Sequence, residues 1–359
     1  MRRRSKRVKL VDVARAANVS PATVSRLMSG GSYTTPQMRD RIFKAAVRLG
    51  FDLERNRKSR IIAFLLSNRD VLHPFHSAVL MGAEAYCAEH DYGLLFLPMR
   101  YSMATPPEEL HLPGIFQRRQ IITGVIVAGT NSENLLSLLT KRGIPWVVLG
   151  NNLVAERREK LLGAVYFDDI AGAYEMTRYL QSLGHRRIGF VGNLQLPWFS
   201  RRYEGYEKAM KEAGLSVRVG ESHSRDGDDM GYLTTKQILQ QPDPPTAIFA
   251  GDDAVAVGAY KAARDSGLRV PDDISVAGFN DTSEAPTLHP PLTSVRVFAE
   301  ELGNQLAELL LKRIARPDVP QQVVTLPTQL VKRESCSSPA PYPNVQVGVG
   351  QQVVAPTTE

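Results

Sequence analysis

The sequence has few cysteines and no long apolar run, and these two absences exclude several classes of protein. Among its 359 residues the cysteines are Cys87 and Cys336, which lie far apart, so we expect neither a disulfide framework nor a zinc site. No stretch reaches the ~18 consecutive apolar residues that a membrane-spanning helix needs. The basic N-terminus is not followed by the apolar core of a signal peptide, so we expect a cytoplasmic protein.

Motifs for catalysis and for nucleotide binding are absent as well. The first apolar run, IIAFLLSNRD, contains no glycine, whereas a dinucleotide-binding strand is followed by G-x-G-x-x-G. A Walker loop, G-x-S-x-G and H-E-x-x-H are also missing. His73 and His76 have a spacing that suits a metal ion, but no third ligand accompanies them. The sequence therefore predicts a protein that is not an enzyme and that carries no cofactor or metal.

Positive charge is concentrated at the start of the chain. Residues 1–60 contain 16 Lys and Arg against 4 Asp and Glu, a net charge of +12, while residues 61–359 have a net charge of −5. A basic segment attached to a mildly acidic remainder is typical of a protein that binds phosphate groups through one domain. The alternative is a solvated basic tail without a specific target. The helical pattern of the same segment favours the first interpretation.

Apolar residues of this basic segment recur with helical spacing in three places. They fall at Leu10, Val13, Ala14 and Ala17, then at Val24, Leu27 and Met28, and then at Ile42, Ala45, Ala46 and Leu49. Ser20 with Pro21 is a favourable start for the second helix. Thr35 with Pro36 is a favourable start for the third, which Gly50 ends. Three short helices with a tight turn between the first two predict a helix-turn-helix DNA-binding domain.

The remainder of the chain alternates short β-branched runs with helical patterns. The predicted strands are 61–66, 94–97, 124–128, 146–149, 165–167, 188–191, 247–250 and 274–279. Helical patterns lie near 76–90, 132–142, 170–183, 201–213, 230–240, 253–266 and 299–315. This order predicts an α/β fold with parallel sheets and helices on both faces. Ligands of such sheets lie beyond the carboxyl ends of the strands, where polar residues cluster in this sequence. These residues are Ser67, Asn68, Asp252, Asp253, Asn280 and Asp281.

Several segments together resemble the LacI (lactose repressor) family of bacterial transcription regulators. They are DVARAANVSPATVSRLMSG, VYFDDIAGAYEMTRYLQSLGHRRIGFVG, FAGDDAVAVGAY, DDISVAGFNDTSEAPTLHPPLTSVR and LVKRESC, in the order found in the family. The resemblance covers roughly residues 8–336. It implies an all-α helix-turn-helix head joined to a two-lobed α/β core similar to periplasmic sugar-binding proteins, in which the chain crosses between the lobes three times.

The resemblance also implies domain boundaries. We expect the helix-turn-helix domain over 1–51, a shortened basic connector over 52–60, a first lobe over 61–161 with 292–330, and a second lobe over 162–291. Residues 335–359 are polar, proline-rich and without periodicity, and we expect them to form a disordered tail.

Ten residues are expected to contact DNA. They are Lys9, Ser20, Pro21, Ala22, Thr23, Ser25, Arg26, Arg57, Lys58 and Arg60. Pro21, Ala22 and Arg26 occupy the recognition-helix positions that read bases in the family. Arg26 can form a bidentate pair with guanine, whereas Ala22 can only contact a thymine methyl group. For Ser20 the alternative is that its hydroxyl only caps the helix.

Eight residues are expected to contact a small-molecule effector between the lobes. They are Asn68, His73, Phe75, Trp198, Phe199, Arg202, Asp252 and Asn280. The planar fork of Arg202 suits paired hydroxyls or a carboxylate, although an interlobe salt bridge is the alternative. Trp198 and Phe199 either stack on a sugar ring or pack at the interface between the lobes. Asp252 stands where the family frequently has asparagine; since a carboxylate only accepts hydrogen bonds, it favours a hydroxyl-rich or cationic ligand.

The resemblance thus implies a sequence-specific regulator, by family habit a repressor, controlled by a sugar-like effector. A homodimer would read a near-palindromic operator with its two heads. Two alternatives stay open. The core can serve only for dimerisation without a ligand, or the chain can be a sugar-binding protein without a regulatory role.

The connector departs from the family pattern. Relatives commonly place a short helix there, with a leucine wedge that enters the minor groove, whereas this chain has the shorter segment DLERNRKSR. Leu53 is a possible wedge, but a packing contact with the head is the alternative. Because Arg55, Arg57, Lys58 and Arg60 make the rest basic, we hypothesise that the minor groove is contacted electrostatically.

A smaller operator bend is the expected consequence of this connector, because no side chain would be inserted between base steps. Circular-permutation gel shifts on a bound operator measure the bend angle. A bend as large as that produced by a wedge-bearing relative would contradict the hypothesis.

Overall fold

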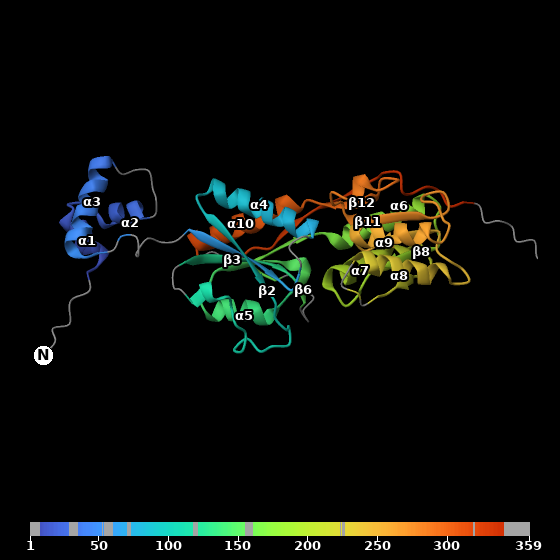
Figure 1. The fold of residues 1–359 in the computed structure, drawn as a ribbon, viewed down its shortest axis with the longest axis horizontal. Coiled ribbons are helices and arrows are strands. Elements are labelled where there is room, and N and C mark those ends of the chain that lie inside the picture. The colour runs from blue at the N-terminus through green and yellow to red at the C-terminus, as the bar shows by residue number, and fades with distance from the viewer. Residues whose placement is uncertain are drawn as a thin grey trace, which may run out of the picture. The chain divides into compact units, whose positions relative to one another are not determined.

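The computed structural model describes residues 8–28, 35–51, 53, 60–69, 73–117, 121–154, 161–222, 224, 227–318 and 320–340. The chain begins with three short helices and continues as two α/β units (Figure 1). We call residues 8–53 the head. The first lobe consists of residues 60–168 with 298–327, and the second lobe of residues 169–297 with 328–340, following the division of the chain into compact units.

The head has the three predicted helices, α1 (Leu10–Ala16), α2 (Pro21–Met28) and α3 (Pro36–Leu49). The hydroxyl of Thr35 accepts a hydrogen bond from the Met38 backbone N–H at 3.3 Å, and Gly50 ends α3 with a φ of +64°. The apolar stripes meet in one small core, which contains Val13, Ala14, Ala17, Val24, Met28, Ile42, Ala45, Ala46 and Leu53. The predicted helix-turn-helix arrangement is confirmed.

The first lobe is built on a parallel sheet with the strand order β13-β7-β5-β3-β1-β2. Its strands are β1 (Ile61–Ser67), β2 (Gly93–Met99), β3 (Ile122–Gly129), β5 (Trp146–Leu149), β7 (Ala164–Phe167) and β13 (Val324–Leu326). A small pair, β4 (Asn131–Ser132) and β6 (Leu153–Val154), and two 3₁₀ turns, Gly114–Gln117 and Gly150–Asn152, complete the connections.

Helices α4 (Pro74–Glu89) and α10 (Ala299–Ala315) lie side by side on one face of this sheet, and α5 (Glu133–Lys141) covers the other (Figure 1). Glycines permit the close approach of α4 and α10. A Cβ at Gly82 would lie 1.9 Å from the Glu300 carbonyl oxygen, and one at Gly303 would lie 2.1 Å from the Val79 carbonyl oxygen. Any side chain at either position would therefore push the two helices apart.

The second lobe repeats the plan with the strand order β14-β12-β11-β10-β8-β9. Its strands are β8 (Ile188–Val191), β9 (Arg218–Gly220), β10 (Ala247–Ala250), β11 (Ser275–Asn280), β12 (Thr293–Val297) and β14 (Thr328–Val331), of which β14 is antiparallel to β12. Its helices are α6 (Asp169–Ser182), α7 (Pro197–Glu212), α8 (Gly227–Leu239) and α9 (Asp253–Arg264), with a 3₁₀ turn at Ala285–Thr287. The helices α6 and α7 pack as one pair, and α8 and α9 pack as another. Of two adjacent residues in β11, one contacts α9 and the next contacts α6.

The predicted fold class is confirmed, and the chain passes between the units after residues 168, 297 and 327. The observed limits differ from the predicted ones. Residues 164–167 pair in the first sheet, although we expected them in the second lobe, while residues 293–297 and 328–331 pair in the second sheet. The three crossings directly follow β7, β12 and β13. An apolar run in a sequence does not show which sheet its strand joins.

The segment 335–340 is ordered, contrary to the predicted disorder of residues 335–359. Ser335 is fully buried, its hydroxyl donates to the Val276 carbonyl oxygen at 2.6 Å, and it accepts from the Thr293 backbone N–H at 2.8 Å. Polar composition suggested a tail, but here the hydroxyls satisfy backbone groups at the sheet. The remainder of the predicted tail lies outside the described residues.

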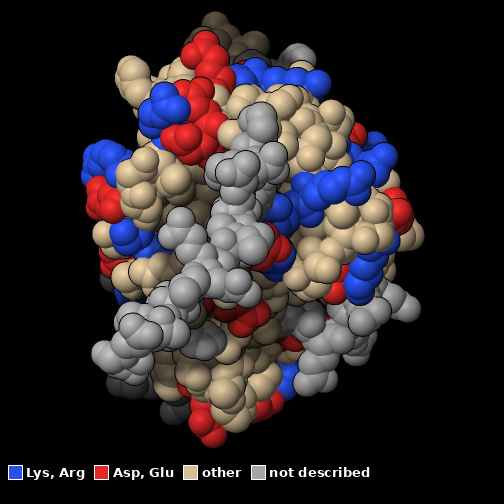
Figure 2. All heavy atoms as spheres, turned by 90° about the vertical axis from the view of Figure 1, so that its right-hand side faces the viewer, with Lys and Arg blue, Asp and Glu red and all other residues tan. Residues whose placement is uncertain are grey.

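Within the described part of the chain, no helix has the length and apolarity required to cross a membrane. Basic and acidic side chains are interspersed on the face of the second lobe that Figure 2 presents. This mixture contrasts with the net positive charge of the N-terminal sixty residues.

His185 anchors the C-terminal segment to the second lobe. It is buried, its Nδ1 lies 2.9 Å from the Thr246 hydroxyl, and its Nε2 lies 2.9 Å from the Ser337 carbonyl oxygen and 3.0 Å from the Ser275 hydroxyl. A carbonyl oxygen only accepts, so Nε2 carries a proton and donates to Ser337. Burial lowers the pKa of His185 below its usual 6.5, although the hydrogen bond to Ser337 opposes this shift.

The stability of the protein is therefore expected to fall as the pH decreases below about 6.5, because the unfolded histidine binds a proton that the folded one resists. Urea unfolding at pH 7.5 and pH 5.5 measures this loss. In the His185→Gln variant the free energy of unfolding should depend less steeply on pH over this interval. Equal pH dependence in the two proteins would contradict the role given to His185.

Candidate DNA-binding and effector sites

The exposed face of α2 presents the side chains predicted to read DNA. Val24 and Met28 are buried in the head, which fixes the rotation of the helix and leaves Ala22, Ser25 and Arg26 exposed. Pro21 is likewise exposed at the amino end. The face that meets solvent thus carries one guanidinium, one hydroxyl and two small apolar groups, a set suited to a major groove.

Ser20 caps the start of α2. Its Oγ accepts from the Thr23 backbone N–H at 3.1 Å and lies 2.8 Å from the Thr23 hydroxyl. Lys9 is exposed directly before α1, and its backbone N–H donates to the Asp12 carboxylate at 2.8 Å. The ammonium group of Lys9 is therefore placed at a helix end, where it can reach a phosphate.

Of the predicted connector contacts, Arg57 and Lys58 lie outside the described residues. Arg60 is held by the first lobe, with its guanidinium 3.3 Å from the Asp91 carboxylate and 5.7 Å from the centre of the Tyr92 ring. Leu53 is 8% exposed and belongs to the core of the head. This burial confirms that Leu53 makes a packing contact with the head.

In the first lobe, Asn68 bridges the carboxyl end of β1 to neighbouring segments. Its side chain donates to the Thr130 carbonyl oxygen at 3.3 Å and accepts from the Tyr101 backbone N–H at 3.0 Å. Its backbone has a φ of +54°, which a residue other than glycine rarely adopts. Strained backbone of this kind clusters at ligand sites, which fits the place of Asn68 at the end of the strand.

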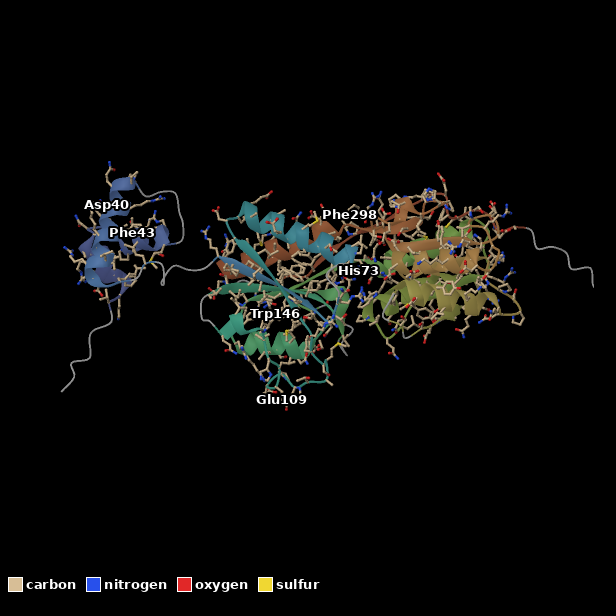
Figure 3. All side chains as sticks on the ribbon, viewed as in Figure 1. Asp40, Phe43, His73, Glu109, Trp146 and Phe298 are labelled. Carbon is tan, nitrogen blue, oxygen red and sulfur yellow. The ribbon has the colours of Figure 1, made fainter. Side chains whose placement is uncertain are left out.

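The aromatic residues around the start of α4 form a compact group. Figure 3 shows His73 at the amino end of this helix. The Phe75 ring is buried, 5.2 Å from the ring of His76 and 5.9 Å from that of Phe167, and the rings of His73 and His76 are 5.6 Å apart. Burial lowers the pKa of His76 well below 6.5, and the positive charge of Arg69 adds to the effect, so this imidazole is neutral.

Three buried polar atoms at the carboxyl end of the first sheet have no hydrogen-bond partner among the described residues. They are Ser67 Oγ, His76 Nδ1 and Asn131 Oδ1. The His76 Nε2 lies 3.5 Å from the Asn152 amide nitrogen, so Nε2 accepts and Nδ1 carries the proton. Buried polar groups without a partner are rare, so each of these atoms calls for an explanation. Asn131 and Asn152 were not predicted, although Asn131 follows a strand as the predicted residues do.

In the second lobe, Arg202 is the central polar side chain. It is 2% exposed, and its guanidinium donates to the Gly251 carbonyl oxygen at 2.5 Å and to Asn280 Oδ1 at 2.9 Å. The guanidinium also lies 4.0 Å from the centre of the Phe279 ring. Burial lowers its pKa to about 10, with nearby aspartates opposing the shift, so the group remains charged at neutral pH.

The carboxylates near Arg202 have distinct structural partners. Asp252 caps α9 by accepting from the Val255 backbone N–H at 2.9 Å. Asp253 accepts from the Ser294 hydroxyl at 2.6 Å, and burial raises its pKa to about 7. Asn280, the partner of Arg202, has a φ of +106°. The cap leaves the second oxygen of Asp252 as an acceptor for a ligand.

Asp169, which was not predicted, is fully buried and pairs with Arg201 at 2.8 Å. Trp198 and Phe199 are 5% and 2% exposed and lie in the hydrophobic core of the second lobe. A Cβ at Gly251 would lie 2.3 Å from the Phe199 ring, so this ring packs directly on the loop that carries Asp252. The structure thus places both aromatic rings inside the second lobe, a position that neither the predicted stacking on a sugar nor the alternative of packing between the lobes named.

The residues described here include no group of three His, Cys, Asp or Glu side chains that could hold a metal ion.

Comparison with known proteins identifies two matching family models. Residues 9–52 match the model for bacterial regulatory proteins of the lacI family, and residues 177–336 match a periplasmic binding protein-like domain. The HTH-type transcriptional repressor CytR of Escherichia coli is 30% identical over 314 residues, which cover 84% of this chain and 89% of CytR. The ribose operon repressor of Haemophilus influenzae is 29% identical over 337 residues, with 91% and 98% covered.

Solved structures also match most of the chain. The regulator CelR in complex with cellobiose is 29% identical, with a TM-score of 0.68 over 92% of this chain and all of CelR. A lac repressor dimer bound to operator and an anti-inducer is 24% identical, with a TM-score of 0.69 and the same coverage, which shows a common fold. A regulator from Enterococcus faecium with bound ribose is 25% identical, with a TM-score of 0.66 over 77% of this chain and 99% of that protein.

Replacing Arg26 with alanine is expected to relax base preference at one operator position and to cost about 1–3 kcal/mol on the specific site. Lys9→Ala should weaken binding to all sequences alike, because a phosphate contact carries no base information. Fluorescence anisotropy on specific and random duplexes measures both effects. Equal losses on the two duplexes for both variants would refute the assigned roles.

Proposed function

The chain belongs to the LacI family of bacterial regulatory proteins, and from this membership we propose that it represses transcription by binding an operator until a small molecule changes its affinity for DNA. As a homodimer it would present two heads to the half-sites of a near-palindrome. The proposal assigns the protein to the cytoplasm, where its DNA target lies.

The observation that carries the effector part of this proposal is the buried Arg202 at the carboxyl end of the second sheet. A guanidinium held by Asn280 and the Gly251 carbonyl oxygen is rigid, and rigid forks suit paired hydroxyl groups. The unpartnered Ser67, His76 and Asn131 atoms at the carboxyl end of the first sheet offer further hydrogen bonds. Asn68, His73 and Asp252 complete the proposed contacts.

We expect a neutral, hydroxyl-rich effector such as a sugar or a nucleoside. Asp252 accepts hydrogen bonds from hydroxyls and would repel an anion, and the neutral His76 adds no positive charge. Two similar proteins are seen with bound cellobiose and bound ribose, which supports the sugar class. The effector would act on DNA binding only through its different affinities for two states of the protein.

Two alternatives make different predictions. A core that only dimerises would bind operator DNA but respond to no small molecule. A sugar-binding protein without a regulatory role would bind a sugar but no specific DNA, which the capped and packed helices of the head argue against.

A thermal-shift screen of the full chain with sugars and nucleosides tests the effector. A true ligand raises the unfolding temperature, since bound ligand stabilises by RT ln(1 + [L]/Kd). Arg202→Lys should weaken the binding of that ligand at least tenfold, because lysine keeps the positive charge but lacks the planar guanidinium group. Operator affinity without ligand should stay unchanged.

Arg186→Gln is the matched control, because Arg186 is an exposed arginine of the same lobe. It should leave both the ligand shift and operator binding intact. If no compound shifts the unfolding temperature of a protein that binds its operator, the dimerisation alternative holds and the effector proposal fails.

A further inference from the structure

The first lobe contains a pocket that the proposed effector contacts do not use. Its volume is 540 Å³, and the residues that line it all belong to the first lobe. It lies between the carboxyl-terminal turns of α4 and α10 and the segment that leads into β13, with Val147 of β5 and Gly163 at the sheet.

This pocket lies at the opposite end of the sheet from the polar groups described above. Val147 is the second residue of β5, and Gly163 directly precedes β7, so both lie at the amino ends of their strands. Asn68 and Asn131, by contrast, follow the carboxyl ends of β1 and β3. In a parallel sheet these ends form two separate edges, and a ligand at one edge leaves the other accessible.

The lining contains more positive than negative charge. Its one carboxylate among the described residues, Glu308, already pairs with Lys312 at 2.6 Å. Arg316 is exposed at the end of α10 and has no ion pair with a carboxylate of the described chain. Arg313 is partly buried and likewise forms no ion pair within those residues.

Arg313 is held in a fixed position by neutral groups. Its guanidinium donates to the Trp146 carbonyl oxygen and lies 5.0 Å from the centre of the Trp146 indole. In the amide orientation that satisfies both side chains, the Gln321 oxygen accepts from Arg313 Nη2 at 2.7 Å. Burial lowers the pKa of Arg313. A bound anion would restore part of the solvation that this cation has lost.

The pocket also has a flat aromatic and apolar side. The Tyr86 ring stacks on the His90 ring with a centroid separation of 4.2 Å and an interplanar angle of 16°, and Leu309 and Leu311 lie in the same lining. Such a surface suits the non-ionic part of a small metabolite.

We propose that this pocket binds a small phosphorylated metabolite, with its phosphate between Arg313 and Arg316 and its remainder against Tyr86 and the leucines. A phosphate ester carries a charge of about −1.5 to −2 at neutral pH, which matches two guanidinium groups that have no carboxylate partner, whereas a carboxylate would neutralise one. This ligand is a second one, distinct from the effector, and its binding does not depend on the proposed repressor function.

Isothermal titration calorimetry of the full chain with phenyl phosphate, inorganic phosphate, phenol and benzoate tests the proposal. Phenyl phosphate should bind more tightly than inorganic phosphate and benzoate, and phenol should show no binding. Arg316→Gln should weaken the binding of phenyl phosphate at least tenfold, since a charge-assisted hydrogen bond is lost. Because Arg316 is exposed, the variant should retain its circular dichroism spectrum and its operator affinity.

Two controls make the result decisive. Arg142→Gln changes an exposed arginine at the end of α5, outside the pocket, and should leave phenyl phosphate binding unchanged. Arg202→Lys should also leave it unchanged. The proposal would be overturned if phenyl phosphate did not bind, or if the Arg316→Gln variant bound it as tightly as the unmodified protein. It would also be overturned if Arg202→Lys abolished phenyl phosphate binding, or if benzoate bound more tightly than phenyl phosphate. Operator binding is measured separately, so failure here leaves the proposed repressor function standing.

Discussion

Parallel strand pairing is the constraint on which the chemistry of both lobes depends. Because the strands of each sheet run in one direction, apart from β14, the residues that follow them gather at one edge. Asn68 and Asn131 meet in this way in the first lobe, and Asp252 and Asn280 in the second. In the first lobe the opposite edge gathers the ends of α4 and α10 with the arginines of α10. The strand direction thus keeps Asn68 and Asn131 apart from those arginines.

Burial of Arg202 is an energetically costly feature of the second lobe. A guanidinium removed from water is stable only when its donors are matched, and here the Gly251 carbonyl oxygen, Asn280 and the Phe279 ring supply that compensation. Asp169, Asp252 and Asp253 add favourable negative charge. The arrangement holds the guanidinium in place, so that it would lose little conformational entropy on contact with the proposed effector.

Features set by neighbouring residues, such as helix ends and buried helix faces, could be predicted from the sequence better than contacts between distant segments. The cap at Thr35, the left-handed end at Gly50 and the rotation of α2 follow from nearest neighbours along the chain, and all three are found. Trp198 was predicted near a ligand, but its ring lies in the core of the second lobe. Its helix begins at Pro197, four residues before the predicted start at 201, and proline is a typical first helical residue.

Pairing between distant segments could not be predicted, because the sequence of an apolar strand does not indicate which other strand it pairs with. Residues 164–167 joined the first sheet and residues 335–340 the second through contacts with strands remote in sequence. The unpartnered atoms of Ser67, His76 and Asn131 likewise depend on three separate segments. Only the assembled sheet edge reveals that they lack partners.

The interleaved path of the chain also shapes how the molecule is made. On the ribosome, the first lobe cannot complete its fold until α10 and β13 have been synthesised, which happens after nearly all of the second lobe. The second lobe in turn requires β14 and Ser335, which follow later in the chain. The head has all its core residues within the first 53 and can fold as soon as they emerge. A nascent chain therefore carries a finished DNA-binding module long before either lobe has closed its sheet.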